Sequence, residues 1–177
     1  MQTRSHTQSG FSLIEVVVAV AVIAVLGGIL TPVVGRYVTT SKCQSVVEDF
    51  KAIEAAMASY LADIRTLEPL KDITYFEAEP GSKTARHFRS GDGQAGWDGP
   101  YLNAIQSKSA FGGRYDIDVF GPLSASIDLG GKADLGTSYT AVLEFLNGVL
   151  DGDGDLQKGT VWGDADGIHY GFNYIRQ

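Results

Sequence analysis

The chain has 177 residues, a formal net charge of -7 at pH 7 and a sequence pI near 4.8. The length allows one globular domain besides a membrane anchor, and the acidity argues against a nucleic-acid-binding protein, which needs a basic face. The single cysteine, Cys43, excludes an intrachain disulfide.

A polar leader, residues 1–10, precedes an apolar run from Phe11 to Leu30 that contains one charged residue, Glu15. As a helix, about 20 residues reach roughly 30 Å, the thickness of a bilayer core. The apolar core of a cleaved secretory signal is shorter, about 7–15 residues. Because the leader carries an arginine and no acid, we expect it to stay in the cytoplasm, with the residues after about Thr31 outside.

Glu15 requires a polar partner, because a carboxylate that faces lipid costs about 2.5–3.5 kcal/mol. One interpretation is that it reaches water at the cytoplasmic interface. In the other, the chain is cut after Gly10, and the new α-amino group of Phe11 becomes a cation. Glu15 of a neighbouring subunit could pair with that cation and set the axial stagger between subunits.

The junction at residues 10–15 reads Gly-Phe-Ser-Leu-Ile-Glu, and Pro32 follows the apolar run. This arrangement resembles the class III signal of type IV pilins and type II secretion pseudopilins, a family with a helix-kinking proline at that position. The resemblance implies that a prepilin peptidase/methyltransferase cleaves between Gly10 and Phe11 and methylates Phe11. It also implies that Glu15 and Pro32 serve assembly.

The same resemblance implies the location and the partners. The protein would be a single-pass protein of the bacterial inner membrane, with its head in the periplasm, and would then join a periplasmic or surface fibre. Its partners would be copies of itself in a helical fibre, related minor subunits, an inner-membrane assembly platform and membrane lipid. We expect no nucleic-acid partner.

The helix is predicted to continue to about Thr66, before Pro69. Apolar residues recur on one face at helical spacing: Val46, Phe50, Ile53, Met57, Tyr60 and Ile64. The other face carries the charged residues Glu48, Asp49, Lys51, Glu54 and Asp63. Pro32 predicts either a simple kink or a segment that unwinds when the subunit joins a fibre. Cys43 fits a small apolar filler or an intersubunit crosslink.

After Pro69 the sequence becomes rich in glycine. Alternating runs predict strands at residues 115–120 and 168–174, whereas residues 138–146 fit a strand or a short helix. Residues 96–102 form a turn with Trp97 and Tyr101, which we expect to anchor a loop on the helix, and the turn resembles a loop of major pseudopilins.

We therefore expect an α+β, pilin-like fold. In it, a long N-terminal helix spans the membrane with its first half and packs on a C-terminal antiparallel sheet with its second half. The predicted regions are a cleaved leader (1–10), a transmembrane and assembly helix (11–34), an amphipathic continuation (35–66) and a β-rich head (67–177).

Five aspartates near the C-terminus are the candidate metal ligands: Asp151, Asp153, Asp155, Asp164 and Asp166. Ca²⁺ prefers six to eight oxygen ligands, which a glycine-rich loop can supply, although the spacing is not that of an EF-hand. A solvated acidic turn is the alternative. The resemblance adds that major pseudopilins hold calcium in a C-terminal loop in place of a disulfide, which agrees with the lone cysteine.

We expect no enzymatic activity, because the chain contains no nucleophile elbow, zinc-protease motif or phosphate loop. The expected function is a structural subunit of a membrane-assembled fibre, first of all a type II secretion pseudopilin that polymerises to drive protein export. One alternative is a type IV pilin for adhesion, motility or DNA uptake. The other is a monomeric, membrane-anchored calcium-binding module.

Overall fold

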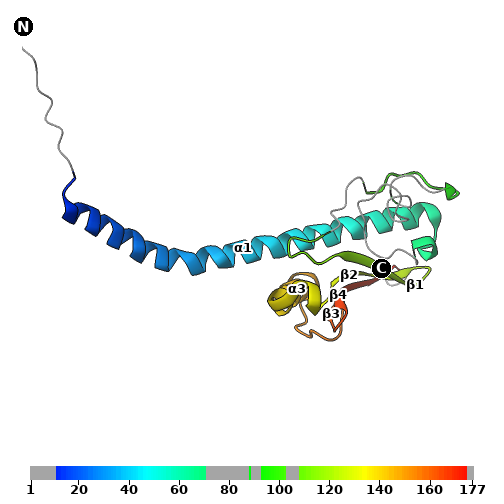
Figure 1. Cartoon of the computed structure of the whole chain (residues 1–177). Coiled ribbons are helices and arrows are strands. Elements are labelled where there is room, and N and C mark those ends of the chain that lie inside the picture. Colours follow the sequence, from blue (N-terminus) through cyan, green and yellow to red (C-terminus); the bar gives the residue numbers. More distant parts are fainter. Residues whose placement is uncertain (1–10, 71–87, 89–92, 103–107, 175–177) are drawn as a thin grey trace, which may run out of the picture. The chain divides into compact units, whose positions relative to one another are not determined.

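The computed structural model describes residues 11–70, 88, 93–102 and 108–174 (Figure 1). The leader, including Gly10, lies outside the described residues. The chain forms two compact units, residues 1–40 and 41–177. The α-helices and strands, in chain order, are α1 (Leu13–Ile64), β1 (Tyr115–Gly121), β2 (Ser124–Gly130), α3 (Lys132–Leu135), α4 (Tyr139–Leu146), β3 (Val161–Gly163) and β4 (Gly167–Asn173). Short helical segments of other types lie at Glu68–Leu70, Gly136–Ser138 and Asn147–Asp151.

Helix α1 begins after Ser12 and ends at Ile64, within two residues of the predicted end. The next residue, Arg65, has a φ of 68°, a left-handed conformation that stops the helix. Pro32 lies inside the helix, and helical structure continues through it. The lone cysteine, Cys43, is buried on this helix, as expected for an apolar filler.

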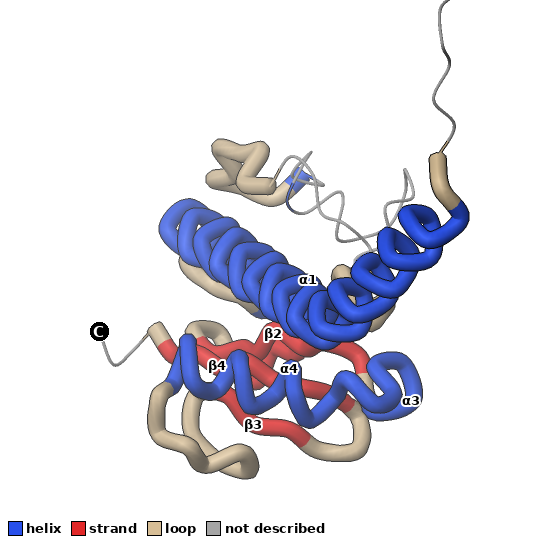
Figure 2. The backbone as a smooth tube through the Cα atoms, turned by 90° about the vertical axis from the view of Figure 1, so that its left-hand side faces the viewer, coloured by secondary structure: helices blue, strands red, loops and turns tan. Residues whose placement is uncertain are grey.

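The four strands form one antiparallel sheet in the order β1-β2-β4-β3. The two predicted strands, at residues 115–120 and 168–174, are confirmed as β1 and β4. The ambiguous segment 138–146 is a helix, α4, because Val142, Leu143 and Leu146 share one buried face at helical spacing. Figure 2 shows α4 lying beside the sheet.

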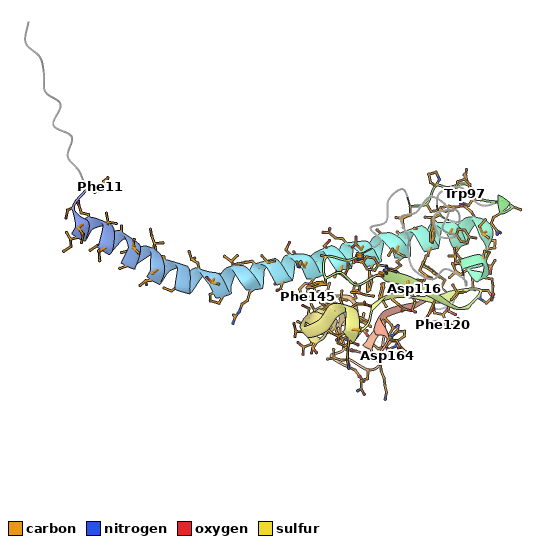
Figure 3. All side chains as sticks on the ribbon, in the orientation of Figure 1. Phe11, Trp97, Asp116, Phe120, Phe145 and Asp164 are labelled. Carbon is orange, nitrogen blue, oxygen red and sulfur yellow. The ribbon has the colours of Figure 1, made fainter. Side chains whose placement is uncertain are left out.

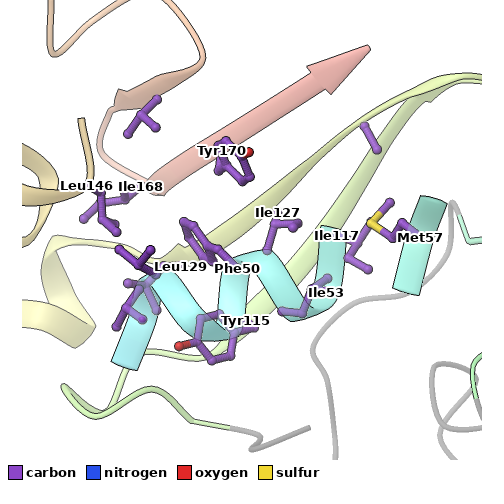
Figure 4. Close-up of a cluster of buried hydrophobic side chains, with 14 of the residues drawn as sticks. Phe50, Ile53, Met57, Tyr115, Ile117, Ile127, Leu129, Leu146, Ile168 and Tyr170 are labelled. Carbon is purple, nitrogen blue, oxygen red and sulfur yellow. The ribbon is translucent and has the colours of Figure 1, made fainter. Parts of the chain in front are cut away.

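The core lies between the second half of α1 and one face of the sheet (Figure 4). Phe50 stacks on Tyr170 of β4, with ring centroids 5.7 Å apart, and meets Tyr115 of β1 edge-on at 5.9 Å. The apolar stripe predicted on the helix is buried as expected from Val46 to Tyr60, and Ile64 is half-buried. The predicted α+β, pilin-like fold is therefore confirmed.

Tyrosine hydroxyls bind the carboxylates of α1 that the sequence places opposite the apolar stripe. Three pairs form: Tyr115 donates to Asp49 at 2.6 Å, Tyr170 to Glu54 at 2.9 Å, and Tyr101 to Asp63 at 2.7 Å. The Tyr101 pair fixes the turn at residues 96–102 on the helix, as predicted. Polar contacts as well as apolar burial thus set the position of the sheet along α1.

Candidate functional site

The start of α1 contains the residues predicted for processing and assembly. Phe11 precedes the helix and is 89% exposed (Figure 3). The Glu15 carboxylate accepts a hydrogen bond from the backbone N–H of Ser12 at 2.8 Å, and Ser12 Oγ accepts one from the N–H of Ile14 at 3.3 Å. This is a capping-box arrangement, in which two side chains satisfy N–H groups that have no partner in the helix.

The capping role of Glu15 was not predicted, although Ser12 and Glu15 have the three-residue spacing of a capping box. The Glu15 carboxylate therefore has a partner within its own chain, the backbone N–H of Ser12, besides the two partners considered from the sequence, water and another subunit. No basic residue follows on α1 before Arg36. Charge pairing of Glu15 consequently requires a cation from outside this part of the helix.

The apolar part of α1 is uncovered. None of its apolar stretch is buried, and this is the one helix among the described residues that is long and apolar enough to cross a membrane. Thr31 donates its hydroxyl to the Gly27 carbonyl at 2.7 Å, which satisfies a polar side chain within the apolar stretch. Such a surface needs lipid or other apolar helices around it.

The acidic loop after α4 is organised by Asn147, which is only 2% exposed. Its amide nitrogen donates to Asp153 Oδ1 at 2.9 Å, to the Asp155 carbonyl at 3.2 Å and to the Val161 carbonyl at 3.4 Å. Its side-chain oxygen accepts from the N–H of Gly154 at 3.0 Å. The loop is thereby closed onto the start of β3 by hydrogen bonds of one side chain.

Asp151 and Asp153 come together in this loop. Asp151 Oδ2 accepts hydrogen bonds from the N–H groups of Thr160 and Val161 at 2.6 and 3.1 Å. Gly159 has a φ of +100°, and the place that a β-carbon would take on it contacts Asp151 Oδ2 and lies 2.6 Å from Asp153 Oδ2. The absent side chain thus leaves room for the two carboxylates to converge.

The other predicted ligands do not join this pair in a single cluster. Asp155 Oδ1 accepts from the N–H of Gln157 at 3.0 Å. Asp164 Oδ1 accepts from the N–H groups of Asp166 and Gly167 in the turn between β3 and β4. Within the described ranges no group of three or more Asp, Glu, His or Cys side chains is gathered as a metal site. A calcium ion at Asp151 and Asp153 would need carbonyl and water oxygens as its remaining ligands.

His169 of β4 links Asp164 to the face of the sheet that lies away from α1. Its Nδ1 lies 2.7 Å from Asp128 Oδ1 and its Nε2 lies 3.1 Å from Asp164 Oδ1, while its ring stacks on Trp162 at 5.2 Å. Burial lowers the pKa of His169, but the hydrogen bonds to the two carboxylates outweigh it and raise the pKa to about 9. The imidazole is therefore a cation at neutral pH that joins β2 to the β3–β4 turn.

The same face of the sheet carries a further acid, Asp118, near Asp128 and Asp116. Burial and the charges of Asp128 and Asp116 raise the pKa of Asp118 to about 6. Asp128 also accepts a hydrogen bond from Ser126 Oγ at 2.8 Å. This group of side chains has a serine, a histidine and aspartates, but the serine hydroxyl bonds the carboxylate rather than the imidazole. The group therefore lacks the serine-to-histidine-to-aspartate order of hydrogen bonds that a nucleophilic triad has.

The chain matches the family model described as the prokaryotic N-terminal methylation motif, over residues 5–31. No curated protein and no solved structure matches the chain. The motif spans the predicted cleavage site, Phe11, Glu15 and most of the apolar helix, and it implies processing by a prepilin peptidase. Together with the helix-on-sheet fold, this motif places the chain among the type IV pilin-like and pseudopilin-like proteins, which are in general structural rather than enzymatic.

Proposed function

We propose that the protein is a structural subunit of a membrane-assembled fibre, and specifically a type II secretion pseudopilin whose polymerisation drives protein export. The helix start is the observation that carries this proposal. An exposed Phe11 precedes an uncovered apolar helix, and the acid near its beginning, Glu15, has only a local hydrogen bond.

The mechanism follows from that geometry. Cleavage before Phe11 turns its nitrogen into an α-amino cation at the end of the helix. Glu15 of the next subunit can then exchange its hydrogen bond to Ser12 for a charge pair in a low-dielectric setting, where an unpaired charge is costly. The apolar helices cover one another as they leave the lipid, and each added subunit moves the fibre outward.

Intact-mass measurement of the protein from membranes of its native host tests the processing step. The expected species begins at Phe11 and carries one additional methyl group. A chain that retains residues 1–10 would contradict the proposal, because Glu15 would have no neighbouring α-amino group to pair with.

Glu15→Gln separates the two roles of the acid. The amide oxygen can still accept from the N–H of Ser12, but the charge is lost. We expect normal membrane insertion and loss of fibres, seen by electron microscopy and by crosslinking in membranes. Ser12→Ala is the matched control, since it alters the cap and leaves the charge, and it should still assemble. Unchanged assembly of Glu15→Gln would favour the monomeric anchored module.

The distinction between pseudopilin and pilin rests on the phenotype of a deletion strain. The buried lone cysteine and the hydrogen-bonded acidic loop support a head that is closed without a disulfide. A pseudopilin predicts that secreted enzymes accumulate in the periplasm of the deletion strain. Normal secretion with loss of long surface fibres would select the type IV pilin, with a role in adhesion, motility or DNA uptake.

We further propose that the acidic loop binds Ca²⁺, with Asp151 and Asp153 as its first ligands and Asp155, Asp164 and Asp166 as further candidates. Calcium at 100 times its dissociation constant would stabilise the fold by about 2.7 kcal/mol. Asp153→Asn keeps a side-chain oxygen for Asn147 and should remove most of that gain. Asp118→Asn, on the sheet face, should keep it. Equal melting temperatures of the unmodified protein with calcium and with a chelator would eliminate the site.

A further inference from the structure

The end of the apolar stretch of α1 forms an open groove of about 440 Å³. Its walls are Pro32, Val33, Arg36, Tyr37 and Thr40, all within the unit of residues 1–40. Pro32, Arg36 and Thr40 are four residues apart, as are Val33 and Tyr37, so that the lining forms two adjacent rows along one side of the helix.

The lining of the groove changes from apolar to polar along the helix. Pro32 and Val33 give it an apolar end, and Arg36 supplies the first positive charge after Phe11. Tyr37 is 73% exposed. Neither the Arg36 guanidinium nor the hydroxyls of Tyr37 and Thr40 have a hydrogen bond or an ion pair with any described residue. The polar end of the groove therefore offers donors that nothing in this part of the chain uses.

The position of the groove along the helix matches the edge of a bilayer. At 1.5 Å per residue, the helix rises roughly 32 Å between Phe11 and Pro32, and the hydrocarbon core of a bilayer is about 30 Å thick. Arg36 lies one turn beyond Pro32, at the depth of the lipid headgroups. Tyrosine is enriched at that depth, and arginine extends its charged end toward it.

We propose that this groove binds an anionic phospholipid of the outer leaflet of the inner membrane. The guanidinium of Arg36 forms paired hydrogen bonds with the lipid phosphate, for which its planar fork is suited. Tyr37 and Thr40 complete the headgroup contact, and Pro32 and Val33 pack on the first methylenes of an acyl chain. The inference rests on the proposed leader-inside orientation. The lipid contact would hold each free subunit at the depth where its Glu15 can meet Phe11 of the neighbouring subunit.

The lipid preference of the processed full-length protein tests the phosphate contact. In nanodiscs that contain phosphatidylglycerol and phosphatidylcholine, native mass spectrometry measures which lipid remains bound. A single basic residue near an anionic surface contributes roughly a fivefold preference, so Arg36→Gln should lower phosphatidylglycerol enrichment about fivefold. Lys51→Gln, which removes an exposed cation farther along α1, should leave it unchanged. Equal enrichment in Arg36→Gln and the unmodified protein would overturn the proposal.

A photocrosslinker at position 37 identifies the occupant of the groove with Arg36 intact. Tyr37→benzoylphenylalanine in phosphatidylglycerol vesicles should give adducts with the mass of one lipid. Adducts only with a second copy of the chain would mean that the groove is a subunit interface and would refute the lipid site. Failure of the protein to insert into vesicles would instead refute the membrane-spanning helix on which the proposed function depends.

Discussion

His169 should make the stability of the head fall as the pH rises through about 9. Its pKa is raised from 6.5 to about 9 by Asp128 and Asp164, and at 1.36 kcal/mol per unit this corresponds to about 3 kcal/mol. A raised pKa means that the folded state holds the proton more tightly than the unfolded state. The stabilisation is therefore complete below pH 6.5 and is lost as the pH rises to 9.

The substitution His169→Gln measures this contribution directly. At pH 6 the variant should have a free energy of unfolding about 3 kcal/mol below that of the unmodified protein. At pH 10, where His169 is neutral, the difference should nearly vanish. Urea unfolding in detergent micelles at both pH values gives the two differences.

Trp162 supplies an independent readout, because its ring lies on the imidazole at 5.2 Å. In a Trp97→Phe background its emission should change with a midpoint near pH 9, and Asp128→Asn should move the midpoint downward. A midpoint near 6.5 in the protein with Asp128 would refute the proposed charge pairing of His169 with Asp128 and Asp164. An equal loss of unfolding free energy in His169→Gln at pH 6 and pH 10 would refute it as well.

Two packing predictions follow from the core. Phe50→Ala should lower the free energy of unfolding by about 3–5 kcal/mol, because the ring fills the space between Tyr115 and Tyr170; the exposed Ser59→Ala on the same helix should change it by less than about 0.5 kcal/mol. Tyr60→Phe should stabilise the protein by about 1 kcal/mol in thermal melts, because the Tyr60 hydroxyl is buried and has no hydrogen-bond partner among the described residues. A lower melting temperature for Tyr60→Phe would show that the hydroxyl has a partner.

The helix could be predicted from the sequence because its signals are local and repeated. The apolar run and the stripe from Val46 to Ile64 indicated the helix and its buried side, and alternating residues indicated β1 and β4. Strand β2 was not predicted, although Ala125, Ile127 and Leu129 alternate with Ser124, Ser126 and Asp128. The burial of Ser126 and Asp128 on its second face depends on side chains from neighbouring strands, and the sequence pattern does not show it.

The candidate sites also differ in how much of each could be predicted from the sequence. The predicted processing site is a short continuous motif, which can be read from the sequence alone, and it stays a prediction. The acids of the C-terminal loop were located as well, but not their partners, because those are far apart in sequence or chemically ordinary. Asp128 is 41 residues from His169, and Asn147 lies in a helical segment that reads as part of an apolar run. Only the folded chain shows that Asp164 binds His169 instead of facing Asp151.

Asn147 provides the test that separates a hydrogen-bonded loop from a calcium-bound one. Asn147→Ala would leave Asp153, Gly154 and two carbonyls without the bonds that the amide supplies. At about 1 kcal/mol per bond, the loss of the four bonds is on the order of 4 kcal/mol. If these bonds close the loop, the loss is the same with calcium and with a chelator, whereas Asp153→Asn loses stability only when calcium is present. If Asn147→Ala destabilises only the calcium-bound protein, then the ion holds the loop, and the Asn147 amide does not close it.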